Sequence, residues 1–356
     1  MSRNRRLSPA MSIASIVSVL AMMVSASVMA SGPAAATDRS ASSEKQEFAP
    51  IDRPGPALSV PEATLAKSLV CSANVERSQR GVVLFVHGTT MTPEENFGWN
   101  WLRAMAQQDR PYCTVAMPNR AMSDAQVSAE YVVSAVRHIH RTSGHKVDIL
   151  GHSQGGLVPR FALRFWPDIR ALVDDYVGFG ATNHGSYMIH ALCPPAVGCS
   201  PSLWQQTAGS DFTRATNSGQ ETFAGISYTN IYTRTDEFVR PALDDSGTSS
   251  LHTGDGRITN VAIQDVCPLD VASEHIAVGS YDPTAYALAI DALDHDGPAD
   301  PDRIAGSVCT QLLMPGVETL QFATEYVNSM TAIAKELVLH DRTPREPDLA
   351  PYVFAG

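Results

Sequence analysis

The chain has 356 residues, a formal net charge of -11 and 44% hydrophobic residues. This composition is that of a globular protein and excludes a wholly disordered chain. The acidic balance argues against nucleic-acid binding and against attraction to anionic lipid headgroups, because both need basic surfaces.

The N-terminus has the pattern of a secretory signal peptide. Three arginines precede residue 7, and residues 7–37 contain no charged residue. Val28-Met29-Ala30 fits the small-x-small cleavage rule, which predicts a signal peptide over residues 1–30, with cleavage as late as residue 36 as a second candidate. An uncleaved membrane anchor is the alternative, since the uncharged run is long enough to span a bilayer. We therefore expect a secreted protein, extracellular or periplasmic.

After an extended lead-in over residues 31–60, we expect one folded domain over residues 61–356, because no linker or repeat interrupts it. All six cysteines lie in this part of the chain. In an exported protein, an even number of cysteines predicts three disulfides. A zinc site is the alternative, but the chain has no CxxC pair, so no metal is expected.

The domain alternates predicted strands and helices. Residues 81–86 form a short, apolar, β-branched run that is typical of a buried parallel strand. Ser123 and Gln126 form a capping-box pattern before a helix that closes near Gly144. The later elements are a helix from Gln154 to Trp166 and strands over 146–150, 175–180, 227–233 and 258–263. This alternation predicts an α/β fold with a mostly parallel central sheet flanked by helices.

The sharpest chemical signal is Gly151-His152-Ser153-Gln154-Gly155, a G-x-S-x-G motif. A predicted strand enters the motif and a predicted helix leaves it, which is the context of a nucleophile elbow. Glycines two residues before and after the serine remove the side chains that would collide in such a tight turn. We therefore predict that Ser153 is a catalytic nucleophile.

A serine hydroxyl needs a base to act as a nucleophile at neutral pH. The chain order of this fold predicts an acid and then a histidine after the serine. Asp236 follows the strand at 227–233, and His275 follows the strand at 258–263, so both lie beyond strand ends, as Ser153 does. Three other residues compete for these roles, His252 as the base and Glu237 and Asp270 as the acid.

An oxyanion hole needs two backbone N–H donors. Gln154, the residue after the nucleophile, should supply one of them. Thr89, in the Gly88-containing loop after the first strand, should supply the other, and its hydroxyl lies in the same loop. We interpret His87 in this loop as a structural residue.

These segments resemble the Candida antarctica lipase B family of α/β-hydrolases, including its bacterial relatives. The resemblance runs from about Cys71 to Met330 and is carried by Val86-His87-Gly88-Thr89, Asn100-Trp101, Ser153-Gln154-Gly155-Gly156-Leu157-Val158, Pro201 to Thr207, and Thr235-Asp236-Glu237. His275, shortly after Val266-Cys267, matches the base of the family. The resemblance implies an α/β-hydrolase fold with Asp236 as the acid and His275 as the base.

The resemblance also implies two disulfides, Cys71 with Cys113 and Cys267 with Cys309. Cys193 and Cys199 have no recognised counterpart in the fungal enzyme. With two prolines between them, a local disulfide that stiffens a surface loop is the simplest interpretation.

The chain departs from the family beside the nucleophile. The fungal member has Trp where this chain has His152, so its substrate preference does not carry over. We interpret His152 as a pocket-wall or core residue and not as a second base. His184 lies past a predicted strand end in a segment that is more similar to bacterial lipases, and we expect it to be structural.

Together these features predict a secreted serine carboxylester hydrolase, lipase-like, that cleaves hydrophobic esters such as acylglycerols through an acyl-enzyme. The expected partners are the ester substrate and, transiently, a lipid–water interface. We expect a monomer without cofactor, metal or nucleic acid. A short-chain or polyester esterase is the main alternative, and a catalytically silent hydrolase fold used for binding is a remote one.

Two regions are expected beside the substrate. A small lid-like insertion should lie over residues 184–205, which have few charges. In the family, the late helix borders the pocket mouth. Most of the apolar stripe of residues 320–337 should pack into the core, as such stripes usually do. Because of the position of the late helix in the family, we expect one or two of its side chains to face the substrate.

Overall fold

A seven-stranded sheet in the order β1-β3-β2-β4-β5-β6-β7 forms the centre of the computed structural model, which describes residues 47–194 and 196–356. All neighbouring strands are parallel except β1 and β3, which are antiparallel. The strands are β1 (Leu69–Cys71), β2 (Val82–Val86), β3 (Tyr112–Val115), β4 (Val147–His152), β5 (Val173–Phe179), β6 (Ser227–Tyr232) and β7 (Arg257–Ala262). The predicted α/β fold is confirmed.

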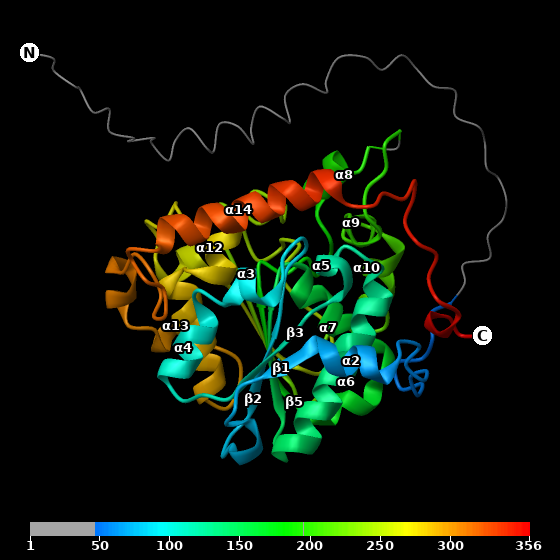
Figure 1. The fold of residues 1–356 in the computed structure, drawn as a ribbon, viewed down its shortest axis with the longest axis horizontal. Helices are drawn as coiled ribbons and strands as arrows, with labels where there is room; N and C mark the ends of the chain where they lie inside the picture. Colours follow the sequence, from blue (N-terminus) through cyan, green and yellow to red (C-terminus); the bar gives the residue numbers. More distant parts are fainter. Residues whose placement is uncertain (1–46, 195) are drawn as a thin grey trace, which may run out of the picture. The chain divides into compact units, whose positions relative to one another are not determined.

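Helices cover both faces of the sheet (Figure 1). One buried apolar cluster joins the sheet to α2, α6, α7 and α10, and a second joins it to α3, α4 and α13. These helices are α2 (Glu62–Ser68), α3 (Pro93–Phe97), α4 (Trp101–Gln107), α6 (Ala125–Ser143), α7 (Gln154–Phe165), α10 (Asp211–Thr216) and α13 (Pro283–Asp294). The others are α5 (Pro118–Ala121), α8 (Tyr187–Leu192), α9 (Pro201–Gln205), α11 (Ile263–Val266), α12 (His275–Ser280) and α14 (Phe322–Leu339). The two apolar faces explain why the central strands β2 and β4 are buried along their whole length.

The central strands β2 and β4 end at the same edge of the sheet and so position the segments that follow them. Every residue of β2 and β4 is buried, and Val86 is in register with Gly151. Because the strands are parallel, their carboxyl ends meet at one edge of the sheet. The loop after β2 and the turn after β4 therefore leave the sheet side by side.

The start of α6 differs from the capping-box prediction. Asp124, not Ser123, is the N-cap residue, and its side chain accepts a hydrogen bond from the Gln126 N–H at 2.9 Å. A carboxylate one residue later competes successfully with the serine hydroxyl because it is the stronger acceptor at a helix N-terminus. The helix closes, as predicted, at Gly144, whose φ is 74°.

Short strands at one edge of the sheet were not predicted. β1 has three residues and β3 has four, and β1 pairs with β3 so that Cys71 lies opposite Cys113. Neither segment has a long apolar run, so only the pairing with a neighbouring strand defines it.

The first and last described segments pack together. Ala49 donates to the Val353 carbonyl at 2.9 Å, and Ala355 donates to the Glu47 carbonyl at 2.8 Å. Residues 47–60 also contact the domain through Trp166, whose indole N–H donates to the Pro56 carbonyl at 2.9 Å. This part of the predicted lead-in is therefore extended and packed.

The predicted signal peptide lies outside the described residues. Among the residues that are described, no helix has the length and apolar character needed to cross a membrane.

Candidate active site

Ser153 lies in the turn between β4 and α7, with φ 57° and ψ -123°. A positive φ is unfavourable for a residue with a Cβ and persists only where the surrounding structure enforces it. Here the Ser153 N–H donates to the Phe179 carbonyl of β5 at 2.9 Å, and the Ser153 carbonyl accepts from the Gly156 N–H at 3.0 Å. The turn thus holds the serine in the strained geometry of a nucleophile elbow.

The two flanking glycines of the motif are needed because backbone passes where their side chains would be. A Cβ on Gly151 would lie 2.0 Å from the Gly155 carbonyl oxygen. A Cβ on Gly155 would lie 2.0 Å from the Val86 carbonyl oxygen of β2. The G-x-S-x-G spacing therefore reports close packing of the turn against itself and against the neighbouring strand.

Asp236 and His275 come from the loops that follow β6 and β7. The Asp236 Oδ2 accepts a hydrogen bond from His275 Nδ1 at 2.8 Å, and both side chains are buried. The other carboxylate oxygen accepts from the N–H groups of Phe238 at 2.8 Å and Val239 at 2.7 Å. The carboxylate is thus fixed in place, and Nε2 is left as the ring nitrogen able to exchange a proton.

Electrostatics favours the charged form of His275. Burial by itself lowers the pKa of the imidazole, but the charge and hydrogen bond of Asp236, and then the charges of Glu237 and Glu274, outweigh it and raise the pKa to about 9. Burial and the charge of Glu237 also raise the pKa of Glu274, to about 7. The ring therefore lies in an environment that stabilises an imidazolium.

The rival residues lie in structural roles. His252 is exposed, and its backbone N–H donates to Glu221 at 2.6 Å. Glu237 accepts from the His275 backbone N–H at 3.1 Å rather than from the ring. Asp270 accepts from the backbone N–H groups of Ala272 and Ser273 and so caps a turn. None of the three contacts the His275 ring nitrogens.

Thr89 and Gln154 were predicted to supply the two oxyanion-hole donors, and the structure leaves both backbone N–H groups without a hydrogen-bond acceptor in the described part of the chain. Gln154 is the first residue of α7, so its N–H has no acceptor within the helix. The Thr89 N–H donates to no other residue of the described part of the chain. The Thr89 hydroxyl donates to the Gln154 side-chain oxygen at 2.8 Å and joins the loop to the helix.

Two amides that the sequence did not single out support this loop. The Gln206 side chain donates to the Thr89 hydroxyl at 3.0 Å and to the Ser202 carbonyl at 3.0 Å. The Asn96 Oδ1 accepts from the Gly88 N–H at 2.9 Å. Gln206 lies within the segment Pro201 to Thr207, and the family resemblance of that segment could have pointed to it. No sequence pattern distinguishes Asn96.

Three histidines near the site have structural contacts. His87 accepts from the Met117 N–H at 3.0 Å, and burial lowers its pKa to about 4. His152 is buried between the elbow and the His275 backbone, and burial lowers its pKa to about 3. His184 contacts Glu221 at 2.5 Å. These contacts agree with the structural roles expected for all three residues.

A mostly apolar cavity of about 60 Å³ lies over the serine. Ser153, His275 and Thr89 line it together. The rest of the lining comes from the loop after β2, from α8 and α9, from the loop after Asp236, and from α12 and α14: Gly88, Thr90, Met91, His152, Thr182, Ile189, Leu192, Leu203, Gln206, Phe238, Val239, Ile276, Ile333 and Leu337. Of the late apolar stripe, Ile333 and Leu337 face the cavity, whereas Leu320 is almost fully exposed.

A group of three carboxylates lies at the other end of the strands. Asp148, Asp174 and Asp175 have oxygen atoms within 4.8 Å of one another, and Lys146 pairs with Asp174 at 2.9 Å. Burial, and then the charge of Asp174, raises the pKa of Asp148 to about 7. The raised pKa of Asp148 and the ion pair of Asp174 with Lys146 both lower the repulsion among the three carboxylates.

Three disulfides join the six cysteines. They link Cys71 to Cys113, Cys193 to Cys199, and Cys267 to Cys309, the same pairs that the resemblance and the local spacing suggested. The third pair spans the segment that carries His275.

Known proteins are similar to this chain in sequence and in fold. The family model of Lipase (class 2) matches residues 83–266. Lipase B of Pseudozyma antarctica is 35% identical over 213 residues, which are 60% of this chain and 61% of that protein, so the match spans less than two thirds of the relative. The crystal structure of Aspergillus fumigatus lipase B is 31% identical, with a TM-score of 0.77, over 87% of this chain and 76% of that one.

Proposed function

The chain belongs to the class 2 lipase family, and we propose that it is a secreted serine carboxylester hydrolase that cleaves hydrophobic esters, such as acylglycerols. The observation that carries the proposal is the meeting of a strained serine with a buried Asp–His pair in one apolar cavity. Both relatives are named lipase B.

In the acylation step, the Ser153 Oγ attacks the ester carbonyl carbon while His275 Nε2 takes the hydroxyl proton. The tetrahedral intermediate then collapses, the bond to the alcohol oxygen breaks, and Nε2 returns the proton to the leaving alcohol. Asp236 holds the ring through Nδ1 and stabilises the imidazolium. The raised pKa of His275 is consistent with this stabilisation.

In the deacylation step, a water molecule repeats the sequence. His275 takes a proton from the water, whose oxygen attacks the acyl carbon, and the proton then passes to Ser153 Oγ as the acid leaves. In both steps the negative oxygen lies against the N–H groups of Thr89 and Gln154. One such donor contributes about 3 kcal/mol to transition-state stabilisation.

The apolar lining favours an ester with a hydrocarbon acyl group. A short-chain or polyester esterase with the same mechanism is the second candidate, and the small volume of the cavity favours it. A catalytically silent binding protein would be expected to lack part of the triad, whereas this chain has all three residues.

Secretion is supported by the three disulfides, which persist in oxidising compartments. It is also supported by the signal-peptide pattern of the first 30 residues. N-terminal sequencing of the protein recovered from the culture medium would test it.

The deciding experiment is ester hydrolysis by the wild type and by Ser153→Ala on p-nitrophenyl esters of increasing length and on emulsified triglyceride. We expect the variant to lose roughly 10⁴-fold or more in kcat. A serine-directed phosphonate should label the wild type but not the variant. Ser128→Ala, at a buried serine of α6, is the matched control and should retain activity.

The base is tested by a second pair of variants. His275→Gln should remove activity, while His252→Gln should leave it unchanged, because His252 lies outside the cavity. Activity that survives in Ser153→Ala, or loss of activity in His252→Gln alone, would contradict the proposal.

A further inference from the structure

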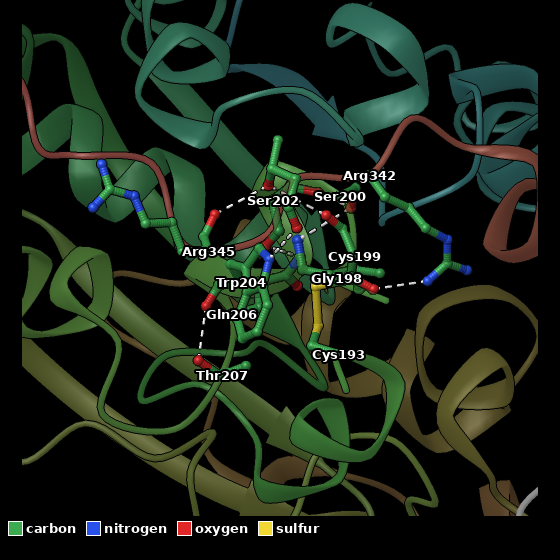
Figure 2. Close-up of a disulfide and its surroundings, with 12 residues drawn as sticks. Cys193, Gly198, Cys199, Ser200, Ser202, Trp204, Gln206, Thr207, Arg342 and Arg345 are labelled. Atoms are coloured by element: carbon green, nitrogen blue, oxygen red, sulfur yellow. Dashed lines mark hydrogen bonds between the residues drawn. A yellow bond between two sulfur atoms is a disulfide. The ribbon is translucent and has the colours of Figure 1, made fainter. Parts of the chain in front are cut away.

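The disulfide between Cys193 and Cys199 joins two segments that line the cavity, while the cysteines themselves lie behind the lining. Ile189 and Leu192 of α8 precede it, and Leu203 of α9 follows it, and all three line the cavity. Both cysteines are buried in the same apolar cluster as Ile189 and Leu203. The disulfide therefore ties together the two segments that form this wall (Figure 2).

A second wall is α14, which contributes Ile333 and Leu337. Leu337 also packs against the apolar cluster that contains both cysteines. The chain that leaves α14 is attached directly to the disulfide loop. The Cys199 N–H donates to the Thr343 carbonyl at 3.2 Å, and the Thr343 N–H donates to the Cys199 carbonyl at 2.8 Å. The two walls are therefore joined through the cysteine itself.

Arg342 strengthens this junction. Its guanidinium donates to the Gly198 carbonyl at 2.8 Å (Figure 2). It also donates to the Leu337 carbonyl at 3.1 Å, so it bridges the loop closed by the disulfide and the end of α14. The indole of Trp204 donates to the Thr343 carbonyl at 3.0 Å. Gly198 has φ 71°, and a Cβ there would lie 2.1 Å from the Thr343 carbonyl oxygen. The backbones of Gly198 and Thr343 are therefore in direct contact, with no room for a side chain between them.

The contact of the Cys193–Cys199 loop with Arg342 and Thr343 limits the space between α14 and the helices α8 and α9. The cavity of about 60 Å³ is smaller than the roughly 150 Å³ of a protein cavity that admits benzene. The cavity is partly open to solvent, so a long acyl chain becomes enclosed along its length only if α8 and α9 move away from α14. A disulfide between α8 and α9, hydrogen-bonded to the segment after α14, opposes this movement.

We propose that the Cys193–Cys199 disulfide is a specificity-determining element that holds the acyl cavity narrow and favours short-chain esters. The inference rests on the proposed ester hydrolase function and deepens it. Each extra methylene that fits a hydrophobic pocket improves binding, so widening the cavity should favour long esters. Neither cysteine contacts the triad, so hydrolysis of a short ester should not depend on the disulfide.

The test compares kcat/KM for p-nitrophenyl butyrate and decanoate in the wild type and in Cys193→Ser/Cys199→Ser. We expect the decanoate-to-butyrate ratio to rise about five- to tenfold, mainly through a lower KM for decanoate. Butyrate turnover should stay within about twofold, since the triad is untouched. The matched control is Cys71→Ser/Cys113→Ser at the β1–β3 edge, which should leave the ratio at the wild-type value.

Gly198→Ala gives an independent test, because its Cβ separates the loop from Thr343 while the disulfide remains. It should raise the ratio in the same direction. If the double cysteine variant does not unfold cooperatively, Gly198→Ala decides the outcome. An unchanged or lower ratio in the deciding variant overturns the inference. Absence of butyrate hydrolysis in the wild type would instead overturn the proposed function.

Discussion

The Nε2–H of His152 donates a hydrogen bond to the backbone carbonyl oxygen of His275 across 3.0 Å, and the two rings lie 4.9 Å apart. The residue before the nucleophile therefore holds the backbone of the base. Because a carbonyl oxygen can only accept, Nε2 must carry the proton. Burial lowers the pKa of His152 to about 3, so the ring is neutral wherever the enzyme would work.

This relationship predicts a positioning role for His152. His152→Phe keeps a ring in the cavity wall but removes the donor, and we expect kcat to fall about tenfold, the equivalent of one hydrogen bond. His152→Gln retains a donor and should recover most of the activity. Phosphonate labelling counts the active sites in each variant. Equal activity of the Phe and Gln variants would contradict the role.

The acidic surroundings of His275 predict activity at neutral to alkaline pH. A base with a raised pKa stays protonated, and therefore inactive, up to higher pH, so the acid limb of kcat/KM should lie above pH 7. Glu274 is ionised in that range because its own pKa is about 7.

Glu274→Gln tests the cause of this shift. Removing the negative charge destabilises the imidazolium, so the acid limb should move to lower pH. Asp296→Asn, at an exposed carboxylate, is the control and should leave the profile in place. A limb that stays in place in Glu274→Gln would show that this carboxylate does not set the pKa of the base.

The close packing of the elbow predicts that alanine destabilises the protein more at Gly155, in the elbow, than at Gly144, at the end of α6. In Gly155→Ala the new Cβ would collide with the Val86 carbonyl, and we expect a loss of about 3 kcal/mol or more in the free energy of unfolding. Gly144→Ala, at the end of α6, meets no atom within 4 Å and carries only the penalty of a positive φ, about 1 kcal/mol. Denaturant unfolding measures both. If both variants lose the same free energy of unfolding, the close packing of the elbow does not contribute to stability as we expect.

The disulfides should differ in their effect on stability. Cys71 and Cys113 are separated by 42 residues, and Cys193 and Cys199 by 6. Loop-closure entropy predicts losses of about 4 and about 2 kcal/mol when each pair is replaced by serine. The comparison uses urea midpoints at matched m-values. A larger loss for the short loop would indicate that packing of Cys193 and Cys199, rather than chain entropy, dominates.

The sequence contained enough information for the centre of the sheet and for the placing of Ser153, Asp236 and His275 at its carboxyl edge. Buried parallel strands have continuous apolar runs, and the elbow needs its glycines, so both leave local patterns. The short strands β1 and β3 leave none, because their pairing with each other and with β2 defines them.

Hydrogen bonds between segments that are distant in the chain could not be predicted either, because they also leave no local sequence pattern. Gln206 reaches Thr89 across 117 positions in the chain, and the Thr343 segment reaches Cys199 across 144. An isolated glutamine or threonine has no pattern that announces such a partner. The side chains of α14 that face the cavity were likewise undetermined, since a helical apolar stripe does not reveal what covers it.

The pairing of Glu47 and Ala49 with Ala355 and Val353 brings the two ends of the catalytic unit together. A fold whose ends meet can be closed by a short linker and opened elsewhere on its surface. The turn after Gly144 precedes β4 and so lies at the end of the strand opposite Ser153. A circular permutant that begins at His145 should therefore keep its active edge intact, and would carry any attached fusion partner on the side remote from the incoming ester.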